Sequence, residues 1–327
     1  MQTDIMAMAA ILETMRESRF FADLTPYDRD GRRLLVAVPV GLLAAVAAAV
    51  LGAASACLLV MVIVSGLDGA PAAAALFSVF DQPARAETEG LASLFLLSVL
   101  AGVNGAAALA FVAVGAWMSH RPIRRYAVVE SAFRTRLLLA GLVLVGAIMG
   151  VVIFIVASLV PAPTPPVLTL ASTSVGRATY AAFAIVLLVI AAAAEEIVFR
   201  GWLLKHLGAF TRNPALLMAV NGLLFALIHF DPNLDAFLVR AAMGAGLTWM
   251  TLRTGGIELA IGAHAANNII ILLLLRPLSL TPETQHPFQL TSLISMVAIG
   301  VGYALLTEAV VRWPIVTRWF GGRPATV

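Results

Sequence analysis

Two adjacent carboxylates, Glu195 and Glu196, stand at the end of an apolar run that begins at Tyr180. A charged side chain at the centre of a bilayer costs about 2.5–3.5 kcal/mol on insertion scales, so acids within apolar segments mark candidate functional sites. Arg200 follows Glu196 by four residues, which is the favourable order for an ion pair on one helix face. Glu195 is rotated by about 100° from Glu196 on a helix. We therefore expect Glu196 to neutralise Arg200 and Glu195 to project into a cavity.

Further polar residues occur in later apolar runs. His229 is four residues after Phe225, and Asn268 is four residues after His264, so each pair shares a helix face. A carboxylate, two imidazoles and a carboxamide can hydrolyse an amide bond. A desolvated glutamate acts as a general base near neutral pH, and a histidine can share the attacking water and protonate the leaving amine. A second histidine and an asparagine can donate hydrogen bonds to the developing oxyanion.

Two other interpretations of these residues stay open. Glu195, His229 and His264 are also the residue types that bind a divalent metal such as zinc. The zinc-protease pattern of two histidines four residues apart with an intervening glutamate is absent. In a purely structural interpretation, Arg200 and interfacial water satisfy the acids, and the imidazoles hydrogen-bond between helices.

The composition predicts the elements that position these residues. The chain is 61% hydrophobic and 12% charged, with a mean hydropathy of +0.96, whereas a soluble domain carries about 25% charged residues. The predicted fold is an all-α polytopic membrane bundle. Apolar runs long enough for a bilayer of about 30 Å predict eight spans, at residues 34–64, 91–118, 137–160, 179–200, 214–230, 235–252, 256–275 and 290–311.

The positions of lysine and arginine predict that both termini face the cytoplasm, because cytoplasmic segments carry the excess of positive residues. In this topology all but four of the 21 lysines and arginines lie on the cytoplasmic side. The exceptions are Arg85, Arg177, Arg240 and Arg276. We expect Arg240 to pair with Asp235 or to extend toward the membrane surface. Elsewhere the charges flank spans and form no arm or patch, so no nucleic-acid partner is predicted.

The chain divides into four predicted regions. Residues 1–33 form a cytoplasmic segment, either an interfacial helix or a solvated leader. Residues 34–175 hold three accessory spans with almost no ionisable side chains, and residues 176–276 hold the candidate catalytic spans. Residues 277–327 hold the last span and a basic tail, where Glu308 is expected to pair with Arg312.

Three ordered motifs carry a resemblance to a known family. They are Glu-Glu-Ile-Val-Phe-Arg at 195–200, Phe-Ala-Leu-Ile-His at 225–229 and His-Ala-Ala-Asn-Asn at 264–268. Together they resemble the CPBP family, which comprises type II CAAX prenyl proteases and Abi-type intramembrane proteases. The resemblance covers about residues 176–276.

The resemblance implies an intramembrane endopeptidase. Glu195 and His229 would activate the hydrolytic water, and His264 with Asn268 would stabilise the oxyanion. Glu196, Arg200 and Phe225 would support the site, and Asn267 duplicates the final asparagine of the third motif. The family's chemistry has been described both as metal-dependent and as glutamate-dependent, so a zinc cofactor stays open.

The expected substrate is a membrane-associated or prenylated peptide or protein. Few lysines beside abundant alanine, valine and arginine indicate a bacterial genome, and hence a bacterial cytoplasmic membrane. Two functions from other classes stay open. One is a non-catalytic Abi-like scaffold or partner-binding protein. The other is a proton-coupled transporter that uses Glu195, which the lack of a visible internal repeat disfavours. The oligomeric state cannot be predicted.

Overall fold

The computed structural model of this protein describes residues 2–128, 132–281 and 283–321, with side chains from residue 6 onward. Within these residues the chain forms helices and connecting segments and no strand, so the predicted all-α class is confirmed. Arg323, which was counted in the predicted basic tail, lies outside the described residues. The helices that correspond to predicted spans are α2 (Gly31–Asp68), α5 (Gly90–Met118), α7 (Thr135–Leu159), α9 (Ser174–Glu196), α11 (Pro214–Leu227), α12 (Leu234–Thr254), α13 (Glu258–Ile270) and α14 (Ser292–Arg312).

Six helical segments of the described chain are long and apolar enough to cross a membrane. They are α2, α5, α7, the continuous segment Ser174–Phe210, the segment Glu258–Leu275 and α14. The protein is therefore a multi-pass membrane protein. Helix α11 has 14 residues, which is about 21 Å of helix, and α12 carries Asp235, Arg240 and Arg253. The count of eight spans stays a prediction for these two helices.

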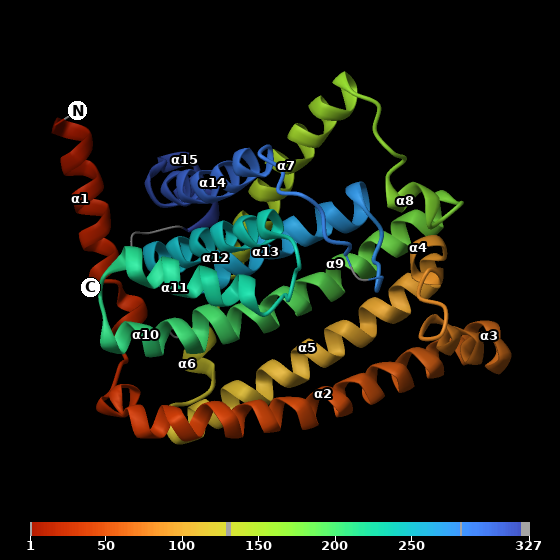
Figure 1. Cartoon of the computed structure of the whole chain (residues 1–327), viewed down its shortest axis with the longest axis horizontal. Coiled ribbons are helices and arrows are strands. Elements are labelled where there is room, and N and C mark those ends of the chain that lie inside the picture. Colours follow the sequence, from red (N-terminus) through yellow and green to blue (C-terminus); the bar gives the residue numbers. More distant parts are fainter. Residues whose placement is uncertain (1, 129–131, 282, 322–327) are drawn as a thin grey trace.

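The long helices pack in a chain of neighbours. Helix α2 packs along α5, α5 along α9, α9 against α13, and α13 against α7, while α12 packs between α11 and α14 (Figure 1). The central core joins α7 and α11–α14 through buried side chains that include Leu137, Phe225, Met243, Ala263 and Tyr303. Helices α2 and α5 form an outer hairpin beside this core. The polar residues predicted to be functional come from α9 and the η4 segment that follows it, from the turn after α11, and from α13.

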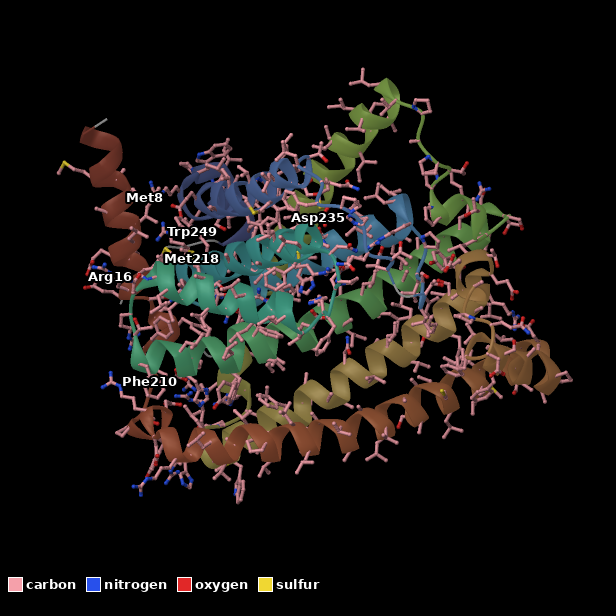
Figure 2. The ribbon with its side chains drawn as sticks, viewed as in Figure 1. Met8, Arg16, Phe210, Met218, Asp235 and Trp249 are labelled. Atoms are coloured by element: carbon pink, nitrogen blue, oxygen red, sulfur yellow. The ribbon has the colours of Figure 1, made fainter. Side chains whose placement is uncertain are left out.

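The shorter helices between the spans lie at the two ends of the bundle. Helix α1 (Gln2–Arg16), α6 (Arg124–Ala127) and α10 (Leu204–Phe210) lie at one end, and α3 (Ala70–Ala75), α4 (Arg85–Thr88) and α8 (Pro166–Thr169) at the other (Figure 1). Figure 2 places Arg16, Phe210 and Trp249 near the first end, and Asp235 at the opposite end of α12. The first end, which we call the N-terminal end, also carries most of the basic residues.

Local sequence signals explain where several helices begin and end. The Asp30 side chain accepts hydrogen bonds from the backbone N–H groups of Arg32 and Arg33, which caps α2. Asn213 caps α11 in the same way, with proline at the first helical position. Gly255 ends α12 in a left-handed conformation at φ 68°, as is common where a helix stops.

Candidate active site

The two glutamates lie at an irregular point of the helix that carries them. Helix α9 ends at Glu196 and continues without a break through a π-helical segment, η4 (Ile197–Leu203), into α10. Single π-helical turns are rare within α-helices and occur frequently at functional sites. The segment contains Arg200, so the irregular backbone and the charged residues coincide.

The predicted ion pair between Glu196 and Arg200 is present. Arg200 Nη1 donates to Glu196 Oε1 at 2.9 Å, and both side chains are fully buried. Arg200 Nη2 donates to the carbonyl oxygen of Gly244 at 3.0 Å, which ties η4 to α12. A buried charge needs both a counter-charge and further hydrogen bonds, and these two contacts supply them.

Glu196 has a second partner, which sequence spacing did not indicate. His264 Nδ1 lies 2.8 Å from Glu196 Oε1, so this oxygen receives both Arg200 and His264. A carboxylate can only accept, so Nδ1 carries the proton and neutral His264 presents Nε2 as an acceptor. His264 Nε2 lies 3.8 Å from Glu195 Oε2. Glu196 therefore orients the imidazole that faces Glu195.

His229 is held in the same tautomer by a different acceptor. Its Nδ1 lies 2.8 Å from the carbonyl oxygen of Phe225, one turn earlier on α11. A carbonyl can only accept, so neutral His229 also presents Nε2 as an acceptor. An acceptor nitrogen in this position can hold a water molecule and help to deprotonate it.

Glu195 is the acid without a cation of its own. Its Oε2 is buried and, within the described residues, has no hydrogen-bond partner. The side chain as a whole is 21% exposed, whereas that of Glu196 is fully buried. The two acids differ in their partners: Glu196 Oε1 accepts from Arg200 and His264, whereas no hydrogen bond of the described residues involves the Glu195 side chain. Glu196 Oε2, like Glu195 Oε2, is buried without a partner in the described chain. The division of labour between the two acids stays a prediction.

Phe225 packs against Arg200 and against both imidazoles of the site. The guanidinium carbon of Arg200 lies 4.6 Å from its ring centre, within the range of a cation–π contact. The rings of His229 and His264 lie edge-on to it, with centroids 4.9 Å and 5.6 Å away. Phe225 is fully buried, so it sets the spacing between the two imidazoles.

The asparagines of the third motif are farther from the centre. Asn267 Nδ2 donates to Asn268 Oδ1 at 3.2 Å. Asn267 is buried and Asn268 half-buried. Among the hydrogen bonds of the described residues none joins either asparagine to Glu195, His229 or His264. The role of Asn268 in binding an oxyanion stays a prediction.

Two supporting residues were missed by the sequence analysis as parts of the site. Asn221 is buried, and its Nδ2 donates to the carbonyl oxygen of Phe199 in η4 at 2.8 Å. Its position four residues before Phe225 was the signal that could have found it. Gly244 on α12 is the second: a Cβ there would lie 2.8 Å from the Cα of Gly222 and 3.3 Å from Arg200 Nη2, so its lack of a side chain permits the close packing.

The predicted pairing of Arg240 with Asp235 is wrong. Arg240 Nη1 donates to Asp231 Oδ2 at 2.5 Å, because the turn after α11 brings Asp231 back over α12. Burial alone would raise the pKa of Asp231, but hydrogen bonds from Arg240 and Asn233 outweigh it, so the pKa lies below its ordinary value. Asp235 instead accepts from Ser292 at 3.1 Å. The predicted pair of Glu308 with Arg312 is confirmed at 2.8 Å, and Arg253 shares the same carboxylate.

The candidate metal ligands do not fit an ion as they are arranged here. Glu195, His229 and His264 have the donor types that zinc prefers, and both Nδ1 atoms have the oriented acceptors typical of zinc histidines. Within the described residues, however, no group of three or more His, Cys, Asp or Glu side chains is close enough to hold a metal. The chemistry below is therefore derived from the carboxylate and imidazoles alone.

Comparison with known proteins finds a family match over the part of the chain that holds these residues. Residues 177–270 match the family of the type II CAAX prenyl endopeptidase, Rce1-like. We call this stretch the Rce1-like segment, after the family that it resembles. The predicted resemblance to CPBP proteases is thereby confirmed, and the Rce1-like segment contains every candidate residue from Glu195 to Asn268.

A curated relative shares the same region. The uncharacterized protein YyaK of Bacillus subtilis (strain 168) is 41% identical over 96 residues, which are 28% of this chain and 32% of that protein. The match thus spans about a third of the relative's length. No solved structure matches the chain. Helices α2, α5, α7 and α14 lie outside the Rce1-like segment and pack around it.

Proposed function

We propose that this protein is an intramembrane endopeptidase in which Glu195 and His229 activate the hydrolytic water. The observation that carries the proposal is the state of Glu195. Its carboxylate has a buried oxygen without a hydrogen-bond partner in the described chain, 3.8 Å from the Nε2 of His264. His229 and His264 both pack edge-on to the Phe225 ring, so the second imidazole belongs to the same site. An Rce1-like segment in a membrane bundle supports peptidase chemistry at this position.

The proposed reaction follows from the tautomers of His229 and His264, which leave each Nε2 as an acceptor in the neutral form. A water molecule between Glu195 and His229 Nε2 loses a proton to the glutamate, and its oxygen attacks the carbonyl carbon of the scissile peptide. When His264 carries a proton on Nε2 as well as on Nδ1, it donates a hydrogen bond to the resulting oxyanion. The proton on Glu195 then passes to the leaving nitrogen as the C–N bond breaks. The water oxygen ends in the new carboxylate.

The proposed substrate is a membrane-associated or prenylated peptide or protein. An apolar groove of about 670 Å³ opens beside the site, between the outer hairpin and the Rce1-like segment. Ile228 and Phe230, on either side of His229, line it together with side chains of α2, α5 and η4, among them Val38, Leu42, Phe111 and Trp202. A hydrocarbon chain or an apolar peptide segment could lie there within reach of His229. Together with the composition, this supports a bacterial cytoplasmic membrane as the place of action.

The test is cleavage in proteoliposomes. Purified protein is incubated with farnesylated peptides and with a transmembrane-anchored peptide library, and products are identified by mass spectrometry. We expect site-specific cleavage by the wild type and none by Glu195→Gln. Equal cleavage by both proteins would refute the assigned role, and retention of partner binding without any cleavage would favour the non-catalytic scaffold.

A further inference from the structure

A second set of buried charges lies at the N-terminal end of the bundle. We call it the N-terminal ion cluster, and it consists of Asp23, Asp28, Arg121 and Lys205. Lys205 and Asp28 are fully buried, and Arg121 is 7% exposed. The four residues come from three separate parts of the chain: the segment after α1, the loop after α5, and α10. The proposed hydrolysis uses none of them.

Lys205 joins α10 to the N-terminal segment. Its Nζ donates to Asp23 Oδ1 at 2.5 Å and to the carbonyl oxygen of Phe20 at 2.8 Å. The ammonium group also lies 4.5 Å from the centre of the Phe20 ring. One lysine therefore binds the segment through a carboxylate, a carbonyl and an aromatic face.

Arg121 joins the loop after α5 to the same segment. It donates to both carboxylate oxygens of Asp28, at 3.1 Å and 2.8 Å, and to the carbonyl oxygen of Asp23 at 2.6 Å. Asp28 also accepts from the backbone N–H of Thr25 at 2.7 Å. The cluster has two acids and two bases, so its formal charge is zero. Removing one partner would leave a buried charge uncompensated.

The cluster is continuous with the candidate active site along one helix. Lys205 is the second residue of α10 and lies five residues after Arg200. Helix α10 directly extends η4. The backbone of η4 is also in close contact with α6: a Cβ on Gly201 would lie 2.5 Å from the carbonyl oxygen of Tyr126. Two hydrogen bonds join η4 to its other neighbours. Arg200 Nη2 donates to the carbonyl oxygen of Gly244 on α12, and Asn221 Nδ2 on α11 donates to the carbonyl oxygen of Phe199. A rotation of η4 about its axis would move Glu195 relative to His229.

We infer that the N-terminal ion cluster positions η4, and that the segment of residues 20–28 is thereby an integral part of the active protease. Lys205 and Asp23 are positioning residues: they touch no reacting atom and act by holding the turn that presents Glu195, Glu196 and Arg200. This inference rests on the proposed function for its catalytic consequence, but not for its structural one.

The test uses the double variant Asp23→Asn/Lys205→Met in the full-length protein. The double variant removes the ion pair between Lys205 and Asp23 and leaves one acid and one base, Asp28 and Arg121, in the cluster. The melting temperature should therefore stay near that of the wild type. Hydrogen exchange of the amides at residues 197–203 should become faster. The kcat for the cleaved reporter peptide should fall by about tenfold or more with KM unchanged, because small misplacements of catalytic groups are costly. Lys205→Arg should keep the wild-type kcat, and Glu13→Gln, an exposed acid of α1, serves as the matched control.

The outcomes separate the two proposals. Wild-type exchange at residues 197–203 together with wild-type kcat in the double variant would overturn the positioning role. Faster exchange in the double variant, with Glu195→Gln as active as the wild type, would leave the positioning role standing and refute the proposed hydrolysis. A fall in kcat of the double variant that is matched by a fall in its melting temperature would show that the cluster contributes stability alone, and would also overturn the inference.

Discussion

At the scale of single residues, the site depends on which atoms can donate. Glu196 and the Phe225 carbonyl both accept from an imidazole Nδ1, at 2.8 Å in each case. Both histidines therefore present an acceptor Nε2 when neutral. His229 can then help to deprotonate a water molecule, whereas His264 must gain a proton before it can assist an oxyanion. Two chemically identical side chains thus receive different roles from their surroundings.

Arg200→Met should destabilise the protein strongly, because it leaves the buried Glu196 without its cation. Breaking a buried ion pair on one side costs about 3–5 kcal/mol. Denaturant titration of the purified protein in detergent measures the free energy of unfolding. Arg16→Met is the control, since the pair of Arg16 with Glu13 is half exposed and worth about 0–1 kcal/mol. A loss below 1 kcal/mol for Arg200→Met would contradict the described burial.

His229→Ala should reduce kcat by about 10²–10⁴-fold, the range for loss of a general acid–base group. The fold should survive, because His229 is exposed in the turn after α11. His286→Ala, which removes a ring from the loop before α14, should leave the rate unchanged. Steady-state kinetics on the reporter peptide measure both, and equal rates for His229→Ala and the wild type would show that another group activates the water.

At the scale of elements, close helix contacts hold the site together. Helices α11 and α12 meet at Gly222 and Gly244, where a Cβ on Gly222 would lie 2.5 Å from the carbonyl oxygen of Ala241. Without side chains at these positions, the two backbones approach closely enough for Arg200 to reach the Gly244 carbonyl oxygen. The small residues and the charged residues therefore belong to one arrangement.

Gly244→Ala should lower stability by about 1–3 kcal/mol, the usual cost of overpacking a tight contact. Thermal unfolding in detergent measures the change. Gly302→Ala on α14 is the matched control, since a Cβ there meets nothing within 4 Å and alanine favours a helix by about 1 kcal/mol. Similar unfolding temperatures for the two variants would argue against the contact.

Much of this arrangement could be predicted from the sequence, and the limits are physical. Periodicity and composition predicted the helices, and spacing of four residues predicted the pairs of Glu196 with Arg200 and Glu308 with Arg312. Contacts between distant segments could not be predicted. The bond of His264 to Glu196 joins two helices, and the bond of Arg240 to Asp231 depends on a turn whose path no local pattern specifies.

The irregular segment η4 shows a second limit. Its sequence, Ile-Val-Phe-Arg-Gly-Trp-Leu, continues the apolar pattern of α9, so periodicity predicts an uninterrupted α-helix. The π-helical turn depends on tertiary partners, Asn221 on one side and Tyr126 on the other. The role of residues 20–28 could not be predicted for the same reason. Their acids pair with bases about a hundred residues or more away.

At the scale of the whole molecule, an inner polar site lies within a lipid-facing bundle. Helices α2 and α5 expose large apolar side chains outward, as a surface in contact with lipid requires. On its inner side the hairpin borders the groove next to His229. The outer helices thus connect the membrane with the site, which fits a substrate that is itself membrane-associated.

Within the described residues, Glu195, His229 and His264 form no group that could hold a metal ion. We therefore expect cleavage to survive metal removal. Activity after treatment with a membrane-permeant chelator such as 1,10-phenanthroline should match that of an untreated sample, with a non-chelating isomer as control. Inhibition that zinc reverses would show that Glu195, His229 and His264 come together around an ion in the working enzyme, in a geometry different from the one described.

The central claim is that water activated by Glu195 cleaves a peptide bond within the membrane. Its most direct test is cleavage of the reporter peptide in water enriched in ¹⁸O, with mass analysis of both products. We expect one ¹⁸O atom in the new carboxyl terminus for the wild type, and no product for Glu195→Gln. A labelled product formed by Glu195→Gln at the wild-type rate would contradict it.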